Sequence, residues 1–239
     1  MKVLLTRQKE DCVRTAKHLE AAGYETVIFP LIAKVRLENR AQNIAPDFLV
    51  FTSAIAVDCV GADLSPVWKE LPVYAVGPRT ASVLVDCGYK NIRQGKGSAR
   101  HLADRILAEQ QSKAASGIYY CAKERAFDME EALSGLNITL ECCVVYEIAK
   151  LKVDKAAFSQ ALSEVAGGVS LLFSPLSAQA FMELVRECEV EKLLEPIHFA
   201  VISEKTSQAV DVRLVKSLHI SKSPNEQSLI EVIKQIQKA

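Results

Sequence analysis

The chain has 239 residues, enough for one large domain or for two domains of about 100–120 residues, each with its own core. Hydrophobic residues make up 49% and charged residues 24% of the chain, as in an ordinary soluble globular protein. Lysine plus arginine and aspartate plus glutamate number 29 each, so composition gives no general attraction for nucleic acid or an anionic membrane. A small polyanion still fits, because backbone amides at helix starts bind anions without net positive charge.

Short apolar runs without regular alternation predict a series of buried strands. Runs of this kind are typical of a parallel sheet that is covered on both faces. In chain order, the expected strands are Val3–Thr6, Thr26–Leu31, Phe48–Phe51, Val73–Val76, Ile118–Cys121, Leu140–Val145, Val169–Phe173, His198–Ile202 and Leu214–Ile220.

Segments with helical spacing lie between most of these strands. The first helix has an apolar stripe that begins at Cys12 and is closed by Gly23, and a later helix opens at Ser98 as its N-cap. Two polar stretches, Lys34–Pro46 and Glu147–Lys155, interrupt the elements, and the chain can cross between domains there. The alternation of strand and helix predicts an α/β fold with right-handed crossovers.

The chain repeats itself at an offset that grows from about 115 to about 127 residues, which is too long for a solenoid. Val3–Arg7 resembles Ile118–Ala122, and the strand-end turns and the last helices also occur twice. The other matched pairs are Phe51–Val57 with Phe173–Phe181, Val73–Leu84 with Phe199–Val210, and Gly95–Ile106 with Ser221–Ile233. This pattern indicates a duplicated unit with loop insertions, and two matched sets of turns suggest a ligand that is held from two sides.

Seven cysteines form no CxxC pair, and neither they nor the four histidines cluster at the short spacing of a zinc site. We therefore expect reduced cysteines in a cytoplasmic protein and no metal. The first residues lack a long apolar segment, and no run of 18 apolar residues occurs, which argues against a signal peptide and a membrane span. The chain also lacks the glycine-rich loops of nucleotide-binding enzymes and the GxSxG of serine hydrolases.

Hydroxyl residues follow the expected strands at matched places in the two copies. Thr52, Ser53, Ser174 and Ser177 each precede a helical segment. A hydroxyl there can cap the helix, while first-turn amides point outward with partial positive charge. In open α/β sheets, ligands bind beyond the carboxyl ends of the strands. Helix capping alone explains any one of these residues, but four at matched positions favour a shared anion-binding role.

The second pair of turns has the same character. Thr80 follows Gly77 in the first turn of a helix, and Thr206 follows Ser203 in the corresponding place. Backbone amides at such turns can hold carboxylates or phosphates.

Two larger side chains complete the candidate site. Tyr146 ends an apolar run just before a polar stretch, and either lines the site as a proton donor or anchors the domain edge. Arg7 ends the first strand and either pairs with a ligand carboxylate or caps the sheet edge.

Together these segments resemble the uroporphyrinogen-III synthase family along nearly the whole chain. The resemblance rests on the order and spacing of short motifs: LLTR at Leu4–Arg7, FTSAIAV at Phe51–Val57, YAVGPRTA at Tyr74–Ala81, VY at Val145–Tyr146, FSP at Phe173–Pro175 and AVISEKTS at Ala200–Ser207.

The resemblance implies two flavodoxin-like parallel-sheet domains joined by a two-stranded connector. One domain would combine residues 1–35 with 149–239, and the other would span 36–148. The implied reaction cyclises hydroxymethylbilane to uroporphyrinogen III in tetrapyrrole (haem) biosynthesis. Water is lost and ring D is inverted through a spiro intermediate, without a metal or an organic cofactor. We expect a monomer, because nothing in the sequence resembles an exposed apolar stripe that would call for a dimer.

The resemblance also implies roles for the candidate residues. Tyr146 would assist departure of the substrate hydroxyl, and Thr80 and Thr206 would lie in or near the cleft. The first turns, with Thr52, Ser53, Ser174 and Ser177, would meet carboxylates largely through main-chain amides.

The sequence departs from the family pattern at two places. Ser203 and Glu204 stand where relatives often have Gly-Pro, and Glu204 should point away from an anionic ligand. Lys123 and Arg125 follow Cys121 where many members have Arg-Gly.

The alternative function is a two-domain α/β module that binds a small anion without catalysis.

Overall fold

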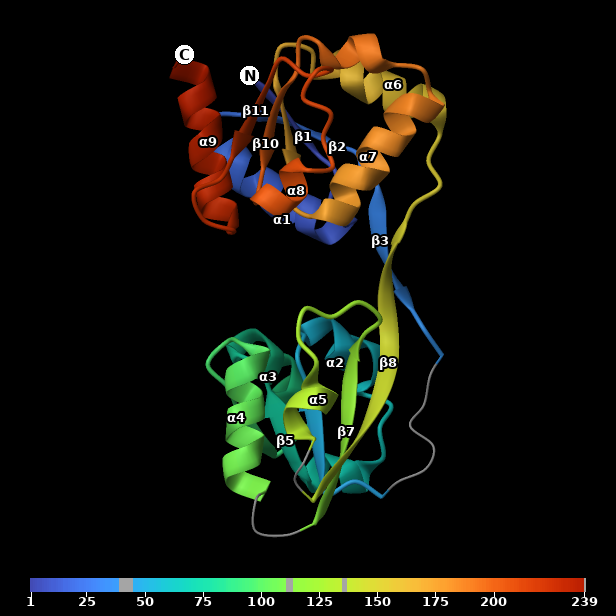
Figure 1. Cartoon of the computed structure of the whole chain (residues 1–239), viewed down its shortest axis with the longest axis vertical. Coiled ribbons are helices and arrows are strands. Elements are labelled where there is room, and N and C mark those ends of the chain that lie inside the picture. The colour runs from blue at the N-terminus through green and yellow to red at the C-terminus, as the bar shows by residue number, and fades with distance from the viewer. Residues whose placement is uncertain (39–44, 111–113, 135–136, 239) are drawn as a thin grey trace. The chain divides into compact units, whose positions relative to one another are not determined.

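The computed structural model describes residues 1–38, 45–110, 114–134 and 137–238. Contacts between residues divide the chain into two compact units. Unit 1 contains Met1–Lys34 and Ala149–Ala239, and unit 2 contains Val35–Ile148. The chain passes from unit 1 to unit 2 along β3 (Ile32–Arg36) and returns along β8 (Ile138–Lys150), two strands that are neighbours in one sheet (Figure 1).

Unit 1 is built on a five-stranded sheet in the order β11-β10-β9-β1-β2, in which all neighbouring strands are parallel. Its strands are β1 (Lys2–Leu5), β2 (Glu25–Ile28), β9 (Val169–Leu172), β10 (His198–Val201) and β11 (Ser217–Ile220). Its helices are α1 (Lys9–Ala21), α6 (Lys155–Glu164), α7 (Pro175–Glu187), α8 (Glu204–Ser207), α9 (Glu226–Lys238) and the 3-10 helix η2 (Glu191–Leu194).

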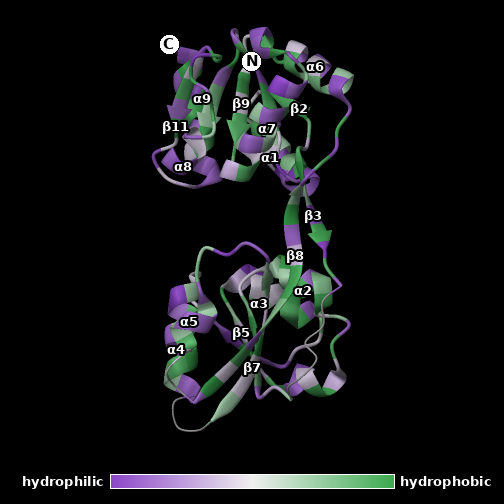
Figure 2. Ribbon diagram, turned by 45° about the vertical axis from the view of Figure 1, so that its right-hand side comes forward, coloured by the Kyte–Doolittle hydropathy of each residue, from purple (hydrophilic) through white to green (hydrophobic). Residues whose placement is uncertain are grey.

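Helices cover both faces of this sheet. On one face, Leu19 of α1 and Ile233 of α9 pack with Leu5 and Leu171 of the strands. Towards α6 and α7, three phenylalanine rings form edge-to-face contacts from Phe158 through Phe181 to Phe199. The central strand β9 is hydrophobic along most of its length in Figure 2, as expected for a strand that is buried on both faces.

Unit 2 contains a six-stranded sheet in the order β3-β8-β7-β4-β5-β6, and its strands from β4 to β8 pair in parallel. Its further strands are β4 (Phe48–Phe51), β5 (Pro72–Ala75), β6 (Asn91–Gln94) and β7 (Ala115–Ala122). Residues of α2 (Ala54–Val60) and α3 (Pro78–Asp86) belong to one core cluster, and those of α4 (Ala99–Gln110) and α5 (Met129–Leu133) to another. The 3-10 helix η1 (Pro66–Glu70) precedes β5.

The two sheets share one spatial order when their strands are matched by the sequence repeat. The order β2-β1-β9-β10-β11 in unit 1 corresponds to β8-β7-β4-β5-β6 in unit 2. Each unit therefore takes its opening strand-helix-strand segment from one copy of the repeat and its remaining strands from the other.

Most expected elements occur, and the differences concern edge strands and polar stretches. The expectation missed β3 and β6, which lie at edges of the sheet and contain polar residues because one side of each strand has no neighbour. The polar stretch Glu147–Lys155 does not end the preceding strand, since β8 continues to Lys150. The stretch Lys34–Pro46 begins inside β3, and its residues 39–44 lie outside the described part of the chain.

Candidate functional site

In each sheet the carboxyl ends of the parallel strands meet at one edge, and most of the candidate residues follow those ends. In unit 2, Thr52 and Ser53 follow β4, Gly77 follows β5 and the segment 95–98 follows β6. In unit 1, Arg7, Ser174 and Ser203 follow β1, β9 and β10 in the same way. This edge is where open α/β sheets bind ligands.

Ser53 and Tyr146 are joined by a hydrogen bond. The Tyr146 hydroxyl donates to the Ser53 Oγ over 3.1 Å, and the same oxygen accepts the Ala56 N–H and so caps α2. Tyr146 lies on β8 and is buried. Burial raises the pKa of its hydroxyl, so Tyr146 is a neutral hydrogen-bond donor at neutral pH.

Thr52 has a tyrosine partner as well. Its Oγ1 lies 2.8 Å from the Tyr119 hydroxyl of β7, and burial raises the pKa of Tyr119 to about 12. The end of β4 is thus hydrogen-bonded through side chains to both β7 and β8. The sequence reasoning missed Tyr119, although its strand was predicted, because the paired hydroxyls come from separate strands.

The turn after β5 packs against the segment that follows β6. The Gly97 N–H donates to the Val76 carbonyl oxygen over 2.7 Å, and the Gly95 N–H donates to that of Ala75. Thr80 lies in the first turn of α3, as expected, but its side chain is buried. Segment 95–98 shapes the same edge, and its Ser98 caps α4 through the His101 N–H as predicted.

In unit 1 the predicted serines act as helix caps. Ser174 and Ser177 form a reciprocal capping box at the start of α7. Ser203 accepts the Thr206 N–H at the start of α8, and its Oγ lies 3.0 Å from the Thr206 Oγ1. Because these side chains are engaged in capping, anion binding at these turns would depend on main-chain amides.

Arg7 is held by acidic residues of its own unit. Its guanidinium lies 3.2 Å from Glu226 and 3.3 Å from Asp11, and its Cζ stands 4.2 Å from the centre of the Phe173 ring. Glu226 also accepts a hydrogen bond from Thr15. The structure therefore places Arg7 in an ion-pair network that joins the end of β1 to the start of α9.

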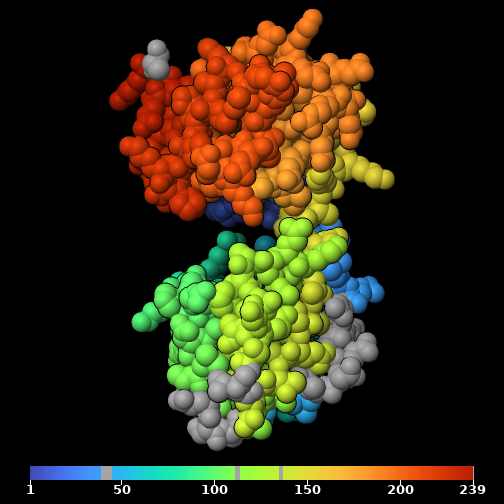
Figure 3. Space-filling model, viewed as in Figure 1, coloured from blue at the N-terminus to red at the C-terminus, as the bar shows by residue number. Residues whose placement is uncertain are grey.

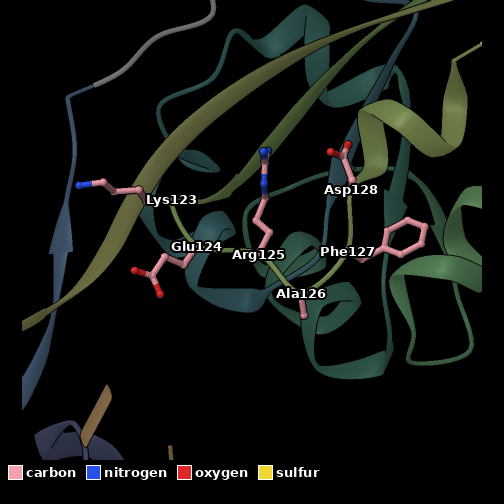
Figure 4. A pocket seen from close by; sticks show the side chains of 6 residues that line it. All are labelled: Lys123, Glu124, Arg125, Ala126, Phe127 and Asp128. Carbon is pink, nitrogen blue, oxygen red and sulfur yellow. The ribbon is translucent and has the colours of Figure 1, made fainter. Parts of the chain in front are cut away.

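The loop that follows β7 lines a pocket of about 600 Å³, formed by Lys123, Glu124, Arg125, Ala126, Phe127 and Asp128 (Figure 4). Lys123 pairs with Glu147 over 2.7 Å, and Arg125 pairs with Glu130 over 3.0 Å. In Figure 4, the side chains of Lys123 and Phe127 extend from opposite ends of the loop, and that of Arg125 lies between them. The segment around this loop, yellow-green in Figure 3, forms part of the exposed surface of unit 2.

The structure brings some candidates together within a unit. In unit 2, Ser53, which follows Thr52 in the sequence, is joined to Tyr146, and in unit 1 Ser203 is joined to Thr206. Glu204 is exposed at the first position of α8. Within residues 1–38, 45–110, 114–134 and 137–238, no three acidic, histidine or cysteine side chains form a group that could hold a metal ion. No helix in these ranges is long and apolar enough to cross a membrane.

Comparison with known proteins extends these observations. The chain matches the family model described as uroporphyrinogen-III synthase HemD over residues 13–231, while no curated protein matches it. Among solved structures, the uroporphyrinogen-III synthetase of Helicobacter pylori is similar at 21% identity, with 98% of each chain covered and a TM-score of 0.66. A mutant uroporphyrinogen III synthase from the extremely thermophilic bacterium Thermus thermophilus is similar at 14% identity over 100% of both chains, with a TM-score of 0.53. At these identities the likeness shows a common two-domain α/β fold.

Proposed function

Because this chain belongs to the uroporphyrinogen-III synthase family, we propose that its substrate is hydroxymethylbilane and its product uroporphyrinogen III. The enzyme is a cyclising hydro-lyase of haem biosynthesis. The observation that carries this function is the family match, which extends over residues 13–231 and so includes parts of both units.

The chemistry of the reaction agrees with the residues at the strand ends. Loss of the substrate hydroxyl gives a cationic azafulvene, which ring D attacks at its substituted α-carbon to form a spiro intermediate. That intermediate opens and recloses with ring D inverted. Since the substrate also closes without an enzyme, to the uninverted isomer, the main task of the protein is to hold one folded conformer.

Tyr146 is the residue that we propose assists departure of the hydroxyl. Its raised pKa keeps the phenol protonated, and its hydroxyl already donates a hydrogen bond to Ser53. A substrate hydroxyl that replaces Ser53 as acceptor would receive the same hydrogen bond, which strengthens as the leaving oxygen gains negative charge.

The strand-end turns are the proposed binding groups for the substrate carboxylates. The side chains of Ser53, Ser174 and Ser203 cap helices, so the amides of the first helical turns would carry this role, with the helix dipole favouring the anion. Arg7 would contribute positive charge from within its ion-pair network. The proposed substrate-binding residues are Arg7, Thr52, Ser53, Thr80, Ser174, Ser177, Ser203 and Thr206.

Product analysis tests the proposed function directly. The protein is incubated with enzymatically made hydroxymethylbilane, the products are oxidised to porphyrins, and isomers I and III are separated by chromatography. We expect isomer III in excess over a protein-free control, in which isomer I forms. Formation of isomer I alone in both samples would overturn the proposal.

We further propose that residues 1–35 with 149–239 and residues 36–148 are two structural domains of a monomer that acts in the cytoplasm. The division of contacts at Lys34 and Ile148 supports the domain assignment. The absence of a disulfide among the seven described cysteines supports a reducing compartment.

A further inference from the structure

Two cysteines of unit 2 lie side by side on neighbouring strands. Cys121 of β7 and Cys142 of β8 have their Sγ atoms 3.2 Å apart, and the two strands are paired in parallel. Both side chains lie on the face covered by α4 and α5, whereas Cys143 belongs to the cluster on the opposite face. The strand pairing therefore brings together two thiols that are 21 residues apart in the sequence.

Arg125 contacts both sulfurs from the loop that follows β7. Its Nη1 lies 3.3 Å from the Cys121 Sγ and also within hydrogen-bond distance of the Cys142 Sγ. The same nitrogen lies 3.0 Å from Glu130. Figure 4 shows the Arg125 side chain directed back from the pocket loop. A fixed guanidinium beside two thiols is the surrounding that stabilises a thiolate.

The electrostatic surroundings set this pair apart from the other cysteines. The hydrogen bond from the Cys142 thiol and the charge of Arg125 lower the pKa of Cys121 in spite of its burial. The pKa of Cys142 is raised, because its proton is held in the hydrogen bond with Cys121. Burial instead raises the pKa of Cys12 to about 12 and that of Cys87 above its usual value. The pair thus loses its first proton more easily than an isolated cysteine does and retains the second between its sulfurs.

We propose that Cys121 and Cys142 form a redox-active dithiol that a hydroperoxide converts reversibly to a disulfide. The thiolate sulfur attacks one peroxide oxygen, the O–O bond breaks, and the departing oxygen leaves as water or an alcohol after taking up a proton. The resulting sulfenic acid is attacked by the second sulfur. The S–O bond then breaks, hydroxide leaves and is protonated to water, and the S–S bond forms. The peroxide is reduced and the dithiol is oxidised by two electrons.

Because Cys121 pairs with Val144 and Cys142 pairs with Tyr119, the two cysteines are diagonal neighbours, and closure needs a local shift of the strands as well as of the sulfurs. The sulfurs need to approach from 3.2 Å to about 2.05 Å, the length of a disulfide bond. Cys121 is fully buried, so a small oxidant reaches the pair from the side of Cys142, which is only partly buried. After closure neither sulfur carries charge, so Arg125 keeps Glu130 as its ion-pair partner and loses the thiolate. Oxidation would therefore change the surroundings of an arginine that lines the pocket.

Thiol counting and peptide mapping of the full chain test this inference without any measurement of enzyme activity. The protein is treated with a small excess of hydrogen peroxide, alkylated and measured by mass spectrometry before and after reduction with dithiothreitol. We expect the number of alkylated cysteines to fall from seven to five and to return to seven on reduction. A non-reducing digest should yield one cross-linked peptide pair that contains Cys121 and Cys142.

Three variants sharpen the test. Cys142→Ser should abolish the cross-link, and Arg125→Gln should slow its formation about tenfold, the effect of a rise of about one unit in the thiol pKa. Cys87→Ser is the matched control, because Cys87 is also partly buried but has no arginine at its sulfur in any described contact, and it should form the cross-link at the wild-type rate. Seven remaining thiols in the wild-type protein, or a cross-link between other cysteines, would overturn the proposal whether or not the variants fold.

Discussion

The Tyr146 hydroxyl donates a hydrogen bond to the Ser53 Oγ over 3.1 Å and so connects β8 with the first turn of α2. These residues are 93 positions apart in the sequence. A β-bulge between β7 and β8 contributes to this contact. Cys121 pairs with Val144 but Ala122 pairs with Tyr146, so the strand alternation shifts by one residue. Tyr146 thereby joins Val145 on the face of the sheet that α2 and α3 cover.

Replacing Tyr146 by phenylalanine tests its proposed role in hydroxyl departure. We expect Tyr146→Phe to lower kcat by roughly tenfold or more with little change in KM. This loss should be smaller than the roughly 10²–10⁴-fold loss typical of general acid catalysis, because the substrate also reacts unaided. Stopped assays that quantify isomer III give both constants. Wild-type turnover in a folded Tyr146→Phe protein would remove Tyr146 from the mechanism.

Ser53 should contribute to stability through its cap on α2. Ser53→Ala removes the acceptor of the Ala56 N–H and of the Tyr146 hydroxyl, and should lower the free energy of unfolding by at least the roughly 0.5–2 kcal/mol of a lost cap, measured by urea denaturation. Ser65 precedes η1 without a side-chain cap hydrogen bond, so Ser65→Ala is the matched control and should stay within about 0.5 kcal/mol of wild type. Equal losses in both variants would contradict a specific capping role.

Glu226 should make stability depend on pH. Burial alone would raise its pKa, but hydrogen bonds from His18 and Thr15 and the charges of Arg14 and Arg7 bring it below its ordinary value of 4.5. A lowered pKa in the folded state means that the ionised network stabilises the fold above pH 4.5. This contribution is lost as the pH falls through the lowered value.

Replacing the carboxylate of Glu226 separates this effect from general acid sensitivity. At pH 7, Glu226→Gln should reduce the free energy of unfolding by roughly 1.5–3 kcal/mol. The difference from wild type should shrink in denaturation curves recorded at successively lower pH below 4.5. Glu231→Gln, an exposed change in the same helix, should follow the wild-type curve. A difference between Glu226→Gln and wild type that does not vary with pH would contradict the network.

Two glycines at the strand ends of unit 2 should differ in their tolerance of a methyl group. A Cβ at Gly95 would lie 2.9 Å from the Val76 carbonyl oxygen, whereas one at Gly77 would meet its nearest atom, the Gly97 Cα, at 3.5 Å. Gly95→Ala should therefore destabilise by about 1–3 kcal/mol, and Gly77→Ala by less than about 1 kcal/mol. Thermal unfolding of both variants at the same protein concentration checks this order. A larger loss of stability in Gly77→Ala than in Gly95→Ala would contradict the prediction.

The proposed domain assignment predicts that unit 2 folds alone. A fragment of residues 35–148 retains both core clusters of its sheet, so it should unfold in one cooperative thermal transition followed by circular dichroism. The full chain is the control for secondary structure content. A fragment without a cooperative transition would contradict the assignment of residues 36–148 as an independent domain.

The α/β class and the central strands could be predicted from the sequence because buried parallel strands read as continuous apolar runs. Phe48–Phe51 and Val169–Leu172 are such runs, and every residue of both is buried. The edge strands β3 and β6 could not be recognised in this way, since a strand with one neighbour tolerates polar residues along its length. The repeat also indicated which turns correspond, and the common spatial order of the two sheets agrees with that correspondence.

What the sequence alone determined was the kind of residue at each strand end, since local chemistry makes Ser53, Ser174 and Ser203 helix caps wherever the strands lie. Only the tertiary structure decided their partners. The pairs Tyr146 with Ser53, Thr52 with Tyr119 and Cys121 with Cys142 all depend on which strands are neighbours, and the first also depends on a bulge. Strand order and register follow from packing across the whole sheet, so contacts between distant residues cannot be read from local patterns.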